Sequence, residues 1–190
     1  MAPPRIRGLV LAAGAGVRFG GPKALAFSDS GSSWLEIATR MLRSGGCADV
    51  LIALGAGADE ARSLVPSDAS ILIVEDWAEG LGATLRAGLV AAARGVDAVV
   101  VTPVDTPDAP SRAVSRVIAA AAKDGRVRVG LVQAVYGGRL GHPVLIGADR
   151  VPEIVGELHG DRGARAAMSA RGVVEVECAD LWSGADVDHR

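Results

Sequence analysis

The stretch "LVLAAGAGVRFGGPKAL" (Leu9–Leu25) decides the fold that this sequence predicts. It starts as a short apolar run, typical of a buried strand, and continues into a turn with four glycines whose only charged residues are Arg18 and Lys23. Glycines lack a Cβ atom, so backbone N–H groups can converge on an anion there, and the two cations add positive charge. The stretch therefore predicts a sheet whose first strand ends in an anion-binding loop.

The rest of the chain alternates short β-branched runs with helical patterns rich in Ala and Leu. Strands are expected at residues 7–13, 49–55, 70–75, 97–105 and 172–178, with two more around a Gly137–Gly138 turn. Helices are expected at 33–44, 59–65, 81–95 and 109–123, followed by two short ones after residue 147. We expect Asp108 to cap the helix at 109–123, and Leu81, Leu85 and Leu89 to be core residues.

This alternation of strands and helices is typical of βαβ units. It predicts an α/β fold with a single doubly wound, Rossmann-like and mostly parallel sheet that carries helices on both faces. The sequence has no linker, repeat or low-complexity segment at which it could be divided, so we expect residues 1–190 to form one domain.

Composition narrows the classes of function. Aromatic residues make up only 3% of the 190 residues, which argues against aromatic platforms that stack bases. A net charge of −2 argues against nucleic acid or a membrane surface as partner. Neither a membrane-spanning apolar run nor a signal-peptide pattern is present. Cys47 and Cys178 lack metal-ligand spacing and are expected to be buried thiols in a cytoplasmic protein.

The glycine loop matches neither of two common phosphate-binding motifs. The dinucleotide motif G-x-G-x-x-G would need a glycine where Phe19 stands. The motif G-x-x-x-x-G-K-[ST] is interrupted by Pro22, and Ala24 replaces its metal-binding hydroxyl residue. The loop nevertheless has the chemistry of a triphosphate cradle, because Arg18 offers a planar fork of donors and Lys23 a point charge.

The pattern L-A-A-G-x-G-x-R-x-G-x-x-K resembles the signature loop of the MobA-like nucleotidyltransferases. The residues that carry it here are Leu11, Ala12, Ala13, Gly14, Gly16, Arg18, Gly20 and Lys23. The resemblance implies that this loop wraps a nucleoside triphosphate and that Arg18 and Lys23 bind its phosphates and act in catalysis.

Acidic residues complete the expected site. A bound triphosphate needs a divalent cation held by oxygen ligands. Asp105 ends the apolar run at 97–105, and "VDTP" resembles the metal motif D-x-P of the same family. The segment "GADVDHR" resembles the family's D-I-D-T segment, which implies Asp188, or Asp186, as the second ligand of Mg²⁺ or Mn²⁺.

Three further segments resemble substrate-binding parts of the family. In "WAEGLGATLRAGL" the resemblance implies that Gly82, Thr84 and Arg86 face the nucleotide. "GGRLGHPVLI" and "LHGDRGARAAM" resemble two motifs of the molybdenum cofactor cytidylyltransferase subgroup. They imply an acceptor site formed by Arg139, His142, Asp161 and Arg165. A lone His is more often structural than catalytic, and without the resemblance His142 before Pro143 is also consistent with a residue that shapes an extended strand.

The family resemblance implies a specific reaction. It is the Mg²⁺-dependent transfer of CMP from CTP to a phosphorylated pterin, molybdopterin or its molybdenum-loaded form, with release of pyrophosphate. The second Ala of "LAAG" resembles the cytidylyl subgroup, and a transient contact with a molybdoenzyme is implied. Guanylyl transfer to the same pterin, nucleotidyl transfer to a sugar or methylerythritol phosphate, and a cofactor carrier or insertion chaperone without turnover remain alternatives.

Overall fold

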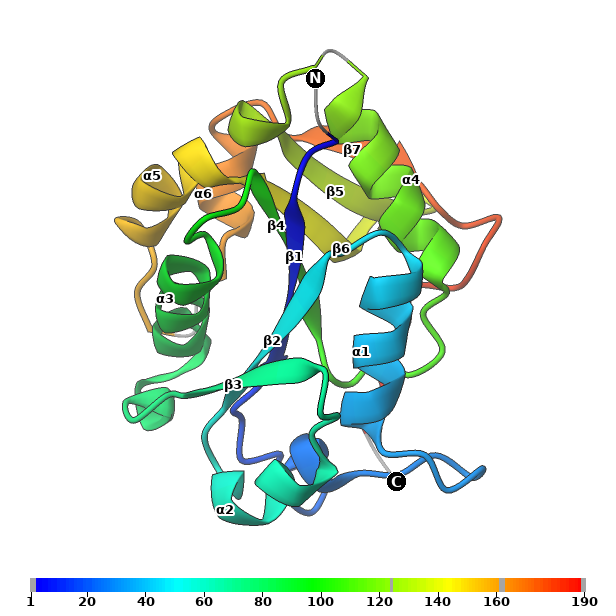
Figure 1. Cartoon of the computed structure of the whole chain (residues 1–190), viewed down its shortest axis with the longest axis vertical. Coiled ribbons are helices and arrows are strands. Elements are labelled where there is room, and N and C mark those ends of the chain that lie inside the picture. The colour runs from blue at the N-terminus through cyan, green and yellow to red at the C-terminus, as the bar shows by residue number, and fades with distance from the viewer. Residues whose placement is uncertain (1–2, 124, 161–162, 189–190) are drawn as a thin grey trace.

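The computed structural model describes residues 3–123, 125–160 and 163–188 of the chain. In these residues the chain forms a seven-stranded sheet of order β3-β2-β1-β4-β6-β5-β7 (Figure 1). The strands are β1 (Ile6–Ala12), β2 (Asp49–Leu54), β3 (Ala69–Ile73), β4 (Ala98–Pro103), β5 (Leu131–Tyr136), β6 (Arg139–Gly147) and β7 (Val174–Glu177). Only β6 runs against the others, pairing antiparallel with both β4 and β5. The predicted α/β class and mostly parallel sheet are confirmed.

Helices cover both faces of the sheet, as predicted. They are α1 (Trp34–Ser44), α2 (Ala58–Ala61), α3 (Leu81–Ala92), α4 (Ser111–Ala122), α5 (Val151–Val155) and α6 (Arg165–Ser169). Helices α1 and α4 pack together on one face, while α3, α5 and α6 lie on the other (Figure 1). None of the helices in the described part of the chain is long and apolar enough to cross a membrane.

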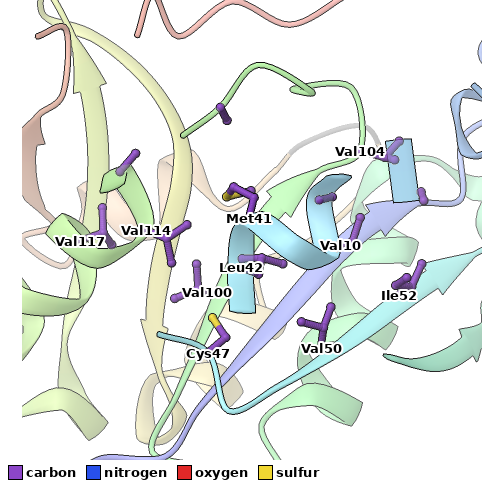
Figure 2. Packing of buried hydrophobic residues seen from close by; sticks show 14 of the residues in the cluster. Val10, Met41, Leu42, Cys47, Val50, Ile52, Val100, Val104, Val114 and Val117 are labelled. Atoms are coloured by element: carbon purple, nitrogen blue, oxygen red, sulfur yellow. The ribbon is translucent and has the colours of Figure 1, made fainter. Parts of the chain in front are cut away.

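Alternate residues of the central strands supply the two cores. On β1, Val10 faces α1 and α4, whereas Leu9 faces α3 and α5. Figure 2 shows the first of these cores, in which Leu42 of α1 and Val114 of α4 pack over the sheet. The two helices approach closely because position 45 is glycine, where a Cβ atom would lie only 2.4 Å from Cβ of Val114.

The two cysteines are buried free thiols, as expected. Burial raises the pKa of the Cys47 thiol to about 12, because the core disfavours the thiolate. Cys47 therefore behaves as a small apolar residue of the α1 core (Figure 2).

Two local predictions are wrong. Helix α4 begins at Ser111 behind Pro110, and no side chain caps it, so Asp108 is not its N-cap. Proline suits the start of a helix because its φ is preset and the first N–H groups of a helix have no internal partner. Leu81 is not a core residue, because it is 45% exposed at the first position of α3.

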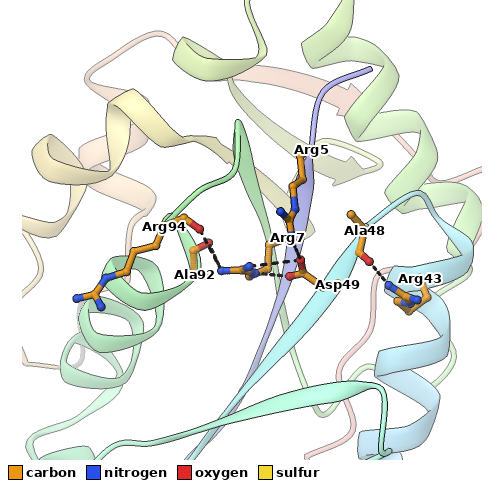
Figure 3. A network of polar contacts seen from close by, with 7 residues as sticks. All are labelled: Arg5, Arg7, Arg43, Ala48, Asp49, Ala92 and Arg94. Atoms are coloured by element: carbon orange, nitrogen blue, oxygen red, sulfur yellow. Dashed lines mark hydrogen bonds and ion pairs between the residues drawn. The ribbon is translucent and has the colours of Figure 1, made fainter. Parts of the chain in front are cut away.

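Charged side chains form a network of hydrogen bonds and ion pairs at the edge of the sheet where β1 and β2 begin (Figure 3). Asp49 binds the guanidinium of Arg7 in a two-pronged ion pair and also lies 2.9 Å from Nη2 of Arg5. Nη1 of Arg7 continues to the carbonyl oxygen of Ala92, at 3.2 Å, at the end of α3. The network joins two strands and a helix, and it lies at the opposite edge from the glycine loop.

Candidate active site

The loop after β1 folds back on itself around Gly16. The carbonyl oxygen of Gly16 accepts hydrogen bonds from the backbone N–H groups of Phe19, Gly20 and Gly21, at 2.9, 3.0 and 3.1 Å. Gly16 has a φ of +60°, and a Cβ atom here would lie 1.9 Å from the carbonyl oxygen of Gly21. Position 16 therefore accepts only glycine, and the loop is a compact turn.

Phe19 anchors this loop to the core. Its ring is buried and packs on Trp34, with ring centroids 5.2 Å apart. The chain then forms a 3-10 turn at Lys23–Leu25, and α1 begins only at Trp34. Both common phosphate motifs need a helix that starts directly behind the loop, so the mismatch seen in the sequence has a structural cause.

Lys23 reaches from the end of the loop to two carboxylates. Its Nζ atom lies 2.8 Å from Oδ2 of Asp105 and 3.1 Å from Oδ1 of Asp188. Asp105 follows the end of β4, so the cluster lies at the carboxyl edge of the parallel strands, where open α/β sheets bind ligands. Burial lowers the pKa of Lys23, but its hydrogen bonds to Asp105 and Asp188 outweigh this effect and leave the pKa raised. The ammonium group is therefore charged at neutral pH.

Three carboxylates of this cluster are placed to share a cation. One oxygen atom from each of Asp105, Asp186 and Asp188 lies within 4.8 Å of the other two. Oδ1 of Asp105 is buried and has no hydrogen-bond partner among the described residues, which is costly for a carboxylate unless a further ligand satisfies it. The structure thus brings together Asp105 and both alternatives for the second metal ligand.

The C-terminal segment is tied to this cluster through its backbone. The N–H of Val187 donates to the carbonyl oxygen of Asp105 at 2.9 Å, so the acidic residues on either side of Val187 are held beside that residue. Further back, the ring of Trp182 packs edge-on against Tyr136, with centroids 5.3 Å apart. These contacts place carboxylates from the end of the chain next to the end of β4.

A pocket of about 390 Å³, called the first pocket below, opens between the glycine loop, α3 and Asp105. Seven of the predicted nucleotide-binding residues line it: Leu11, Ala12, Ala13, Gly14, Gly16, Lys23 and Thr84. Arg18 is not among its lining residues, because its side chain is 77% exposed and its Nη1 atom lies 3.8 Å from Oδ2 of Asp188. Arg18 therefore stands at the exposed side of the carboxylate cluster.

Gly82 and Arg86, which the family resemblance places at the nucleotide, do not line the first pocket. The N–H of Gly82 donates to the carbonyl oxygen of Gly160 at 2.7 Å, and a Cβ atom on Gly82 would clash with that oxygen. Nη2 of Arg86 donates to the carbonyl oxygen of Leu158, also at 2.7 Å, and its side chain lines a separate hollow. Both residues connect α3 to the segment that follows α5.

A second pocket, of about 660 Å³, adjoins the first, and Leu11 and Leu81 line both. Its walls are mainly aliphatic and include Leu85, Val101, Leu140, Val144, Ile146 and Met168. Leu81, which the sequence pattern assigns to the core, thus stands between two cavities. A group bound in one pocket can therefore approach a group bound in the other.

Two of the four predicted acceptor residues lie in the second pocket. His142 comes from β6 and Arg165 from the start of α6. Arg139 does not line the pocket, since its Nη2 atom donates to the carbonyl oxygen of Ser183 at 3.0 Å. Asp161 lies outside the described residues.

His142 is held as a neutral side chain in this position. Burial lowers the pKa of His142 to about 4; the carboxylates of Asp105 and Asp186 oppose this shift, and the nearby Arg165 adds to it. The hydroxyl group of Tyr136 donates to the backbone carbonyl oxygen of His142 at 2.6 Å, which fixes the start of β6 at this place. At neutral pH the imidazole therefore offers one donor and one acceptor without charge.

Sequence reasoning missed two pocket residues. Gln133 is a buried polar residue in the apolar strand β5, and its Nε2 atom donates to the carbonyl oxygen of Gly141 at 3.1 Å in the second pocket. Trp77 lines the first pocket. The available signals were the single polar residue in "LVQAVY" and the rarity of tryptophan, of which the chain has three.

Comparison with known families agrees with the class that this geometry indicates, an α/β enzyme that handles nucleotide phosphates. The family model described as MobA-like NTP transferase domain matches residues 8–176. The chain therefore belongs to the MobA-like NTP transferase family, and the family predicted from the loop motif is confirmed.

The chain is similar to one named oxidoreductase and to solved structures of a mycobacterial protein. The chain is 33% identical over 192 residues to a protein of Paenarthrobacter nicotinovorans named nicotine blue oxidoreductase, covering 97% of this chain and 93% of the relative. The crystal structure of Rv0371c from Mycobacterium tuberculosis H37Rv superposes with a TM-score of 0.82 at 26% identity, covering 100% of this chain and 95% of that chain. Another structure of Rv0371c, described as a complex with manganese, shares the fold with a TM-score of 0.75 at 22% identity, covering 96% and 94%.

Proposed function

We propose that this protein transfers CMP from CTP to a phosphorylated pterin, molybdopterin or its molybdenum-loaded form, and releases pyrophosphate. The observation that carries the proposal is the position of the Lys23, Asp105 and Asp188 cluster beside the glycine loop. The first pocket provides the cradle for the triphosphate, and the second pocket adjoins it at Leu11 and Leu81. Membership of the transferase family supports the reaction type.

The carboxylate cluster fits a divalent cation. Its donors are oxygens of Asp105, Asp186 and Asp188, and Oδ1 of Asp105 has no hydrogen-bond partner among the described residues, which a cation would supply. We assign the binding of Mg²⁺ or Mn²⁺ to these residues, and the description of Rv0371c as a manganese complex supports the choice of metal. A bound cation supplies neutralising charge and orientation for the triphosphate.

The residues of the chain position the reactants and take up charge. The backbone at Gly14–Gly16 holds the triphosphate, and Lys23 provides a partly buried positive charge for the β- and γ-phosphates. An oxygen of the acceptor phosphate attacks the α-phosphorus, while the bond from that phosphorus to the bridging oxygen breaks and its electron pair leaves with pyrophosphate. His142 and Arg165 orient the acceptor on the other side. No covalent intermediate with the protein is needed, because positioning and electrostatics accelerate such transfers.

Pyrophosphate release with each of the four nucleoside triphosphates tests this proposal. Purified protein, Mg²⁺ and molybdopterin are expected to release pyrophosphate with CTP and not with GTP. Release with GTP alone indicates guanylyl transfer, and release only when the pterin is replaced by a sugar phosphate or methylerythritol phosphate indicates those acceptors. Binding of nucleotide without release under every condition contradicts turnover and identifies a carrier.

A second candidate function is an oxidation–reduction, as the name of the relative from Paenarthrobacter nicotinovorans describes. The 33% identity to this relative over 97% of the chain favours it. Under this alternative the electron donor is a nicotinamide dinucleotide, which the glycine loop would have to bind without the common dinucleotide motif. Oxidation of NADH or NADPH in the presence of nicotine blue, followed by absorbance at the nicotinamide band, tests it. No oxidation above the protein-free rate excludes this candidate, whereas metal-independent oxidation would replace the transfer proposal.

A further inference from the structure

We propose that the indole ring of Trp77 is the platform on which the nucleobase stacks in the first pocket. The inference rests on the proposed binding of a nucleoside triphosphate there. It adds a positioning role for a residue that the loop motif and the carboxylate cluster do not use. It also predicts that Trp77 strengthens binding without choosing the base.

The charges of the first pocket fix the direction in which a nucleotide lies. Its charged lining residues among the described part of the chain are Lys23 and Asp105, which stand on the β1 and β4 side. Trp77 follows β3, on the other side of β1 in the strand order. The exposed acidic residues Asp76 and Glu79 flank Trp77 and repel phosphate groups. The phosphates therefore point to Lys23, and the uncharged base points to Trp77.

Trp77 is held in place before any ligand arrives. The residue directly after β2 is Gly55, where a Cβ atom would lie 2.6 Å from Cγ of Trp77, so the absence of a side chain makes room for the indole. The carbonyl oxygen of Trp77 accepts a hydrogen bond from the N–H of Gly80 at 3.1 Å, which closes the turn before α3. A ring fixed in this way loses little conformational entropy when a base stacks on it.

Trp77 lines two hollows. Trp77 lines the first pocket together with Ala13 and Thr84, and it lines a neighbouring hollow together with Gly57 and Glu75. The side toward the first pocket is bordered by small residues such as Ala78 and Gly80, which leave space beside the ring. A flat base fits this side, whereas the neighbouring hollow has acidic walls.

Stacking on Trp77 accounts for the affinity of the pocket for nucleotides, but it does not account for a preference for one nucleobase. Every nucleobase has a π-face, so stacking on an aromatic side chain tolerates all of them. Loss of such a contact weakens binding by about five- to a hundredfold. The hydrogen-bonding groups that distinguish cytosine from guanine must therefore lie elsewhere in the pocket.

Binding measurements with and without a base test the role of Trp77. The ligands are CTP, GTP, ATP and UTP with Mn²⁺, and inorganic tripolyphosphate with Mn²⁺ as the matched ligand without a base. The variants are Trp77→Leu, which removes the ring, and Trp77→Phe, which keeps an aromatic face. Phe27→Leu is the control, because Phe27 is an exposed aromatic residue outside the pockets described here. Thermal unfolding of each variant verifies its fold.

We expect Trp77→Leu to raise the Kd of all four nucleotides by about tenfold and to leave the Kd of tripolyphosphate within about twofold. Trp77→Phe should recover most of the loss, and Phe27→Leu should change nothing. The fluorescence emission that wild type shows and Trp77→Phe lacks comes from Trp77. Nucleotides should quench this emission, and tripolyphosphate should not.

Three outcomes overturn the inference. Unchanged nucleotide affinity in Trp77→Leu shows that the ring does not contact the base. An equal loss for tripolyphosphate shows that the ring only supports the loop. In both cases the wild type still binds nucleotide, so the proposed function survives. If the wild type binds none of the five ligands, nucleotide binding and the role of Trp77 fail together.

Discussion

The ammonium group of Lys23 lies 2.8 Å from the carboxylate of Asp105, at the point where the glycine loop meets the end of β4. The Lys23 ammonium group therefore neutralises the carboxylate that is best placed to bind a metal ion. The same residue lines the first pocket, which we propose as the triphosphate site. This contact makes two parts of the proposed reaction depend on each other. Removing either partner is expected to affect metal binding and phosphate binding in different ways.

Replacing Asp105 with Asn should remove a metal ligand while keeping the side-chain shape. We expect pyrophosphate release to fall by about 100-fold or more, since the electrostatic support of phosphoryl transfer is lost. Asp108→Asn is the matched control, because Asp108 is exposed in the same turn and caps no helix. Circular dichroism should show an unchanged fold in both variants, and near-normal turnover of Asp105→Asn would remove Asp105 from the mechanism.

Replacing Lys23 with Ala should shift two affinities in opposite directions. Tripolyphosphate should bind about tenfold more weakly, because a charged hydrogen-bond donor is lost. Free Mn²⁺ should bind more tightly in the absence of nucleotide, because Lys23 no longer competes for Asp105 and Asp188. Calorimetry and the Mn²⁺ resonance signal measure the two effects, with Lys123→Ala, an exposed lysine behind α4, as control. Weaker binding of both ligands contradicts the assigned competition.

Replacing Gly16 with Ala should destabilise the loop. The new Cβ atom would meet the carbonyl oxygen of Gly21 at 1.9 Å, and the φ of +60° adds strain of about 1–3 kcal/mol. Gly14→Ala is the comparison, since a Cβ atom at Gly14 meets nothing within 4 Å. Urea unfolding should show a loss of stability for the first variant and almost none for the second. Equal stability of the two variants would mean that the turn around Gly16 can rearrange.

Replacing Asp49 with Asn should lower stability in a pH-dependent manner. Partial burial raises the pKa of Asp49, but hydrogen bonds from Arg7 and Arg5 outweigh this and leave it below the usual value. The stabilisation is therefore present above the unfolded pKa of about 4 and is lost as the pH falls through the lower folded value. We expect the variant to be about 1–3 kcal/mol less stable at pH 7.

Urea unfolding at pH 7 and at pH 3 measures this difference between wild type and Asp49→Asn. The difference in the free energy of unfolding between wild type and Asp49→Asn should be smaller at pH 3 than at pH 7. Asp59→Asn serves as control because the side chain of Asp59 is 99% exposed. A gap that stays constant with pH would show that Asp49 acts through its shape and not through its charge.

Much of this fold could be predicted from local patterns. The run at Leu9–Leu25 correctly indicated a strand that ends in a glycine-rich turn, and "VVVTPVD" placed Asp105 behind a central strand. These predictions succeed because the periodicity of apolar residues and the conformational freedom of glycine act over a few residues. The meeting of Asp105 with Asp188 was suggested by family resemblance alone, since nothing local connects two residues so far apart in the chain.

The wrong predictions share a physical cause. The spacing of Leu81, Leu85 and Leu89 shows that they lie on one helix face, but it does not show where the core ends and the pockets begin. The guanidinium of Arg86 could have faced either side of α3, and a carbonyl group 72 residues away decides its position. Tertiary contacts of this kind leave no trace in the local pattern.

The reversal of β6 has a consequence for how this protein can diversify. Because β6 runs against its neighbours, the beginning of that strand, with His142, reaches the same edge as the ends of the parallel strands. Among the described residues, the first pocket is lined by positions up to Asp105, while the polar lining of the second pocket begins at Gln133. Recombination between relatives in the connection from α4 to β5 would therefore exchange the polar chemistry of one cavity and leave the lining of the other intact.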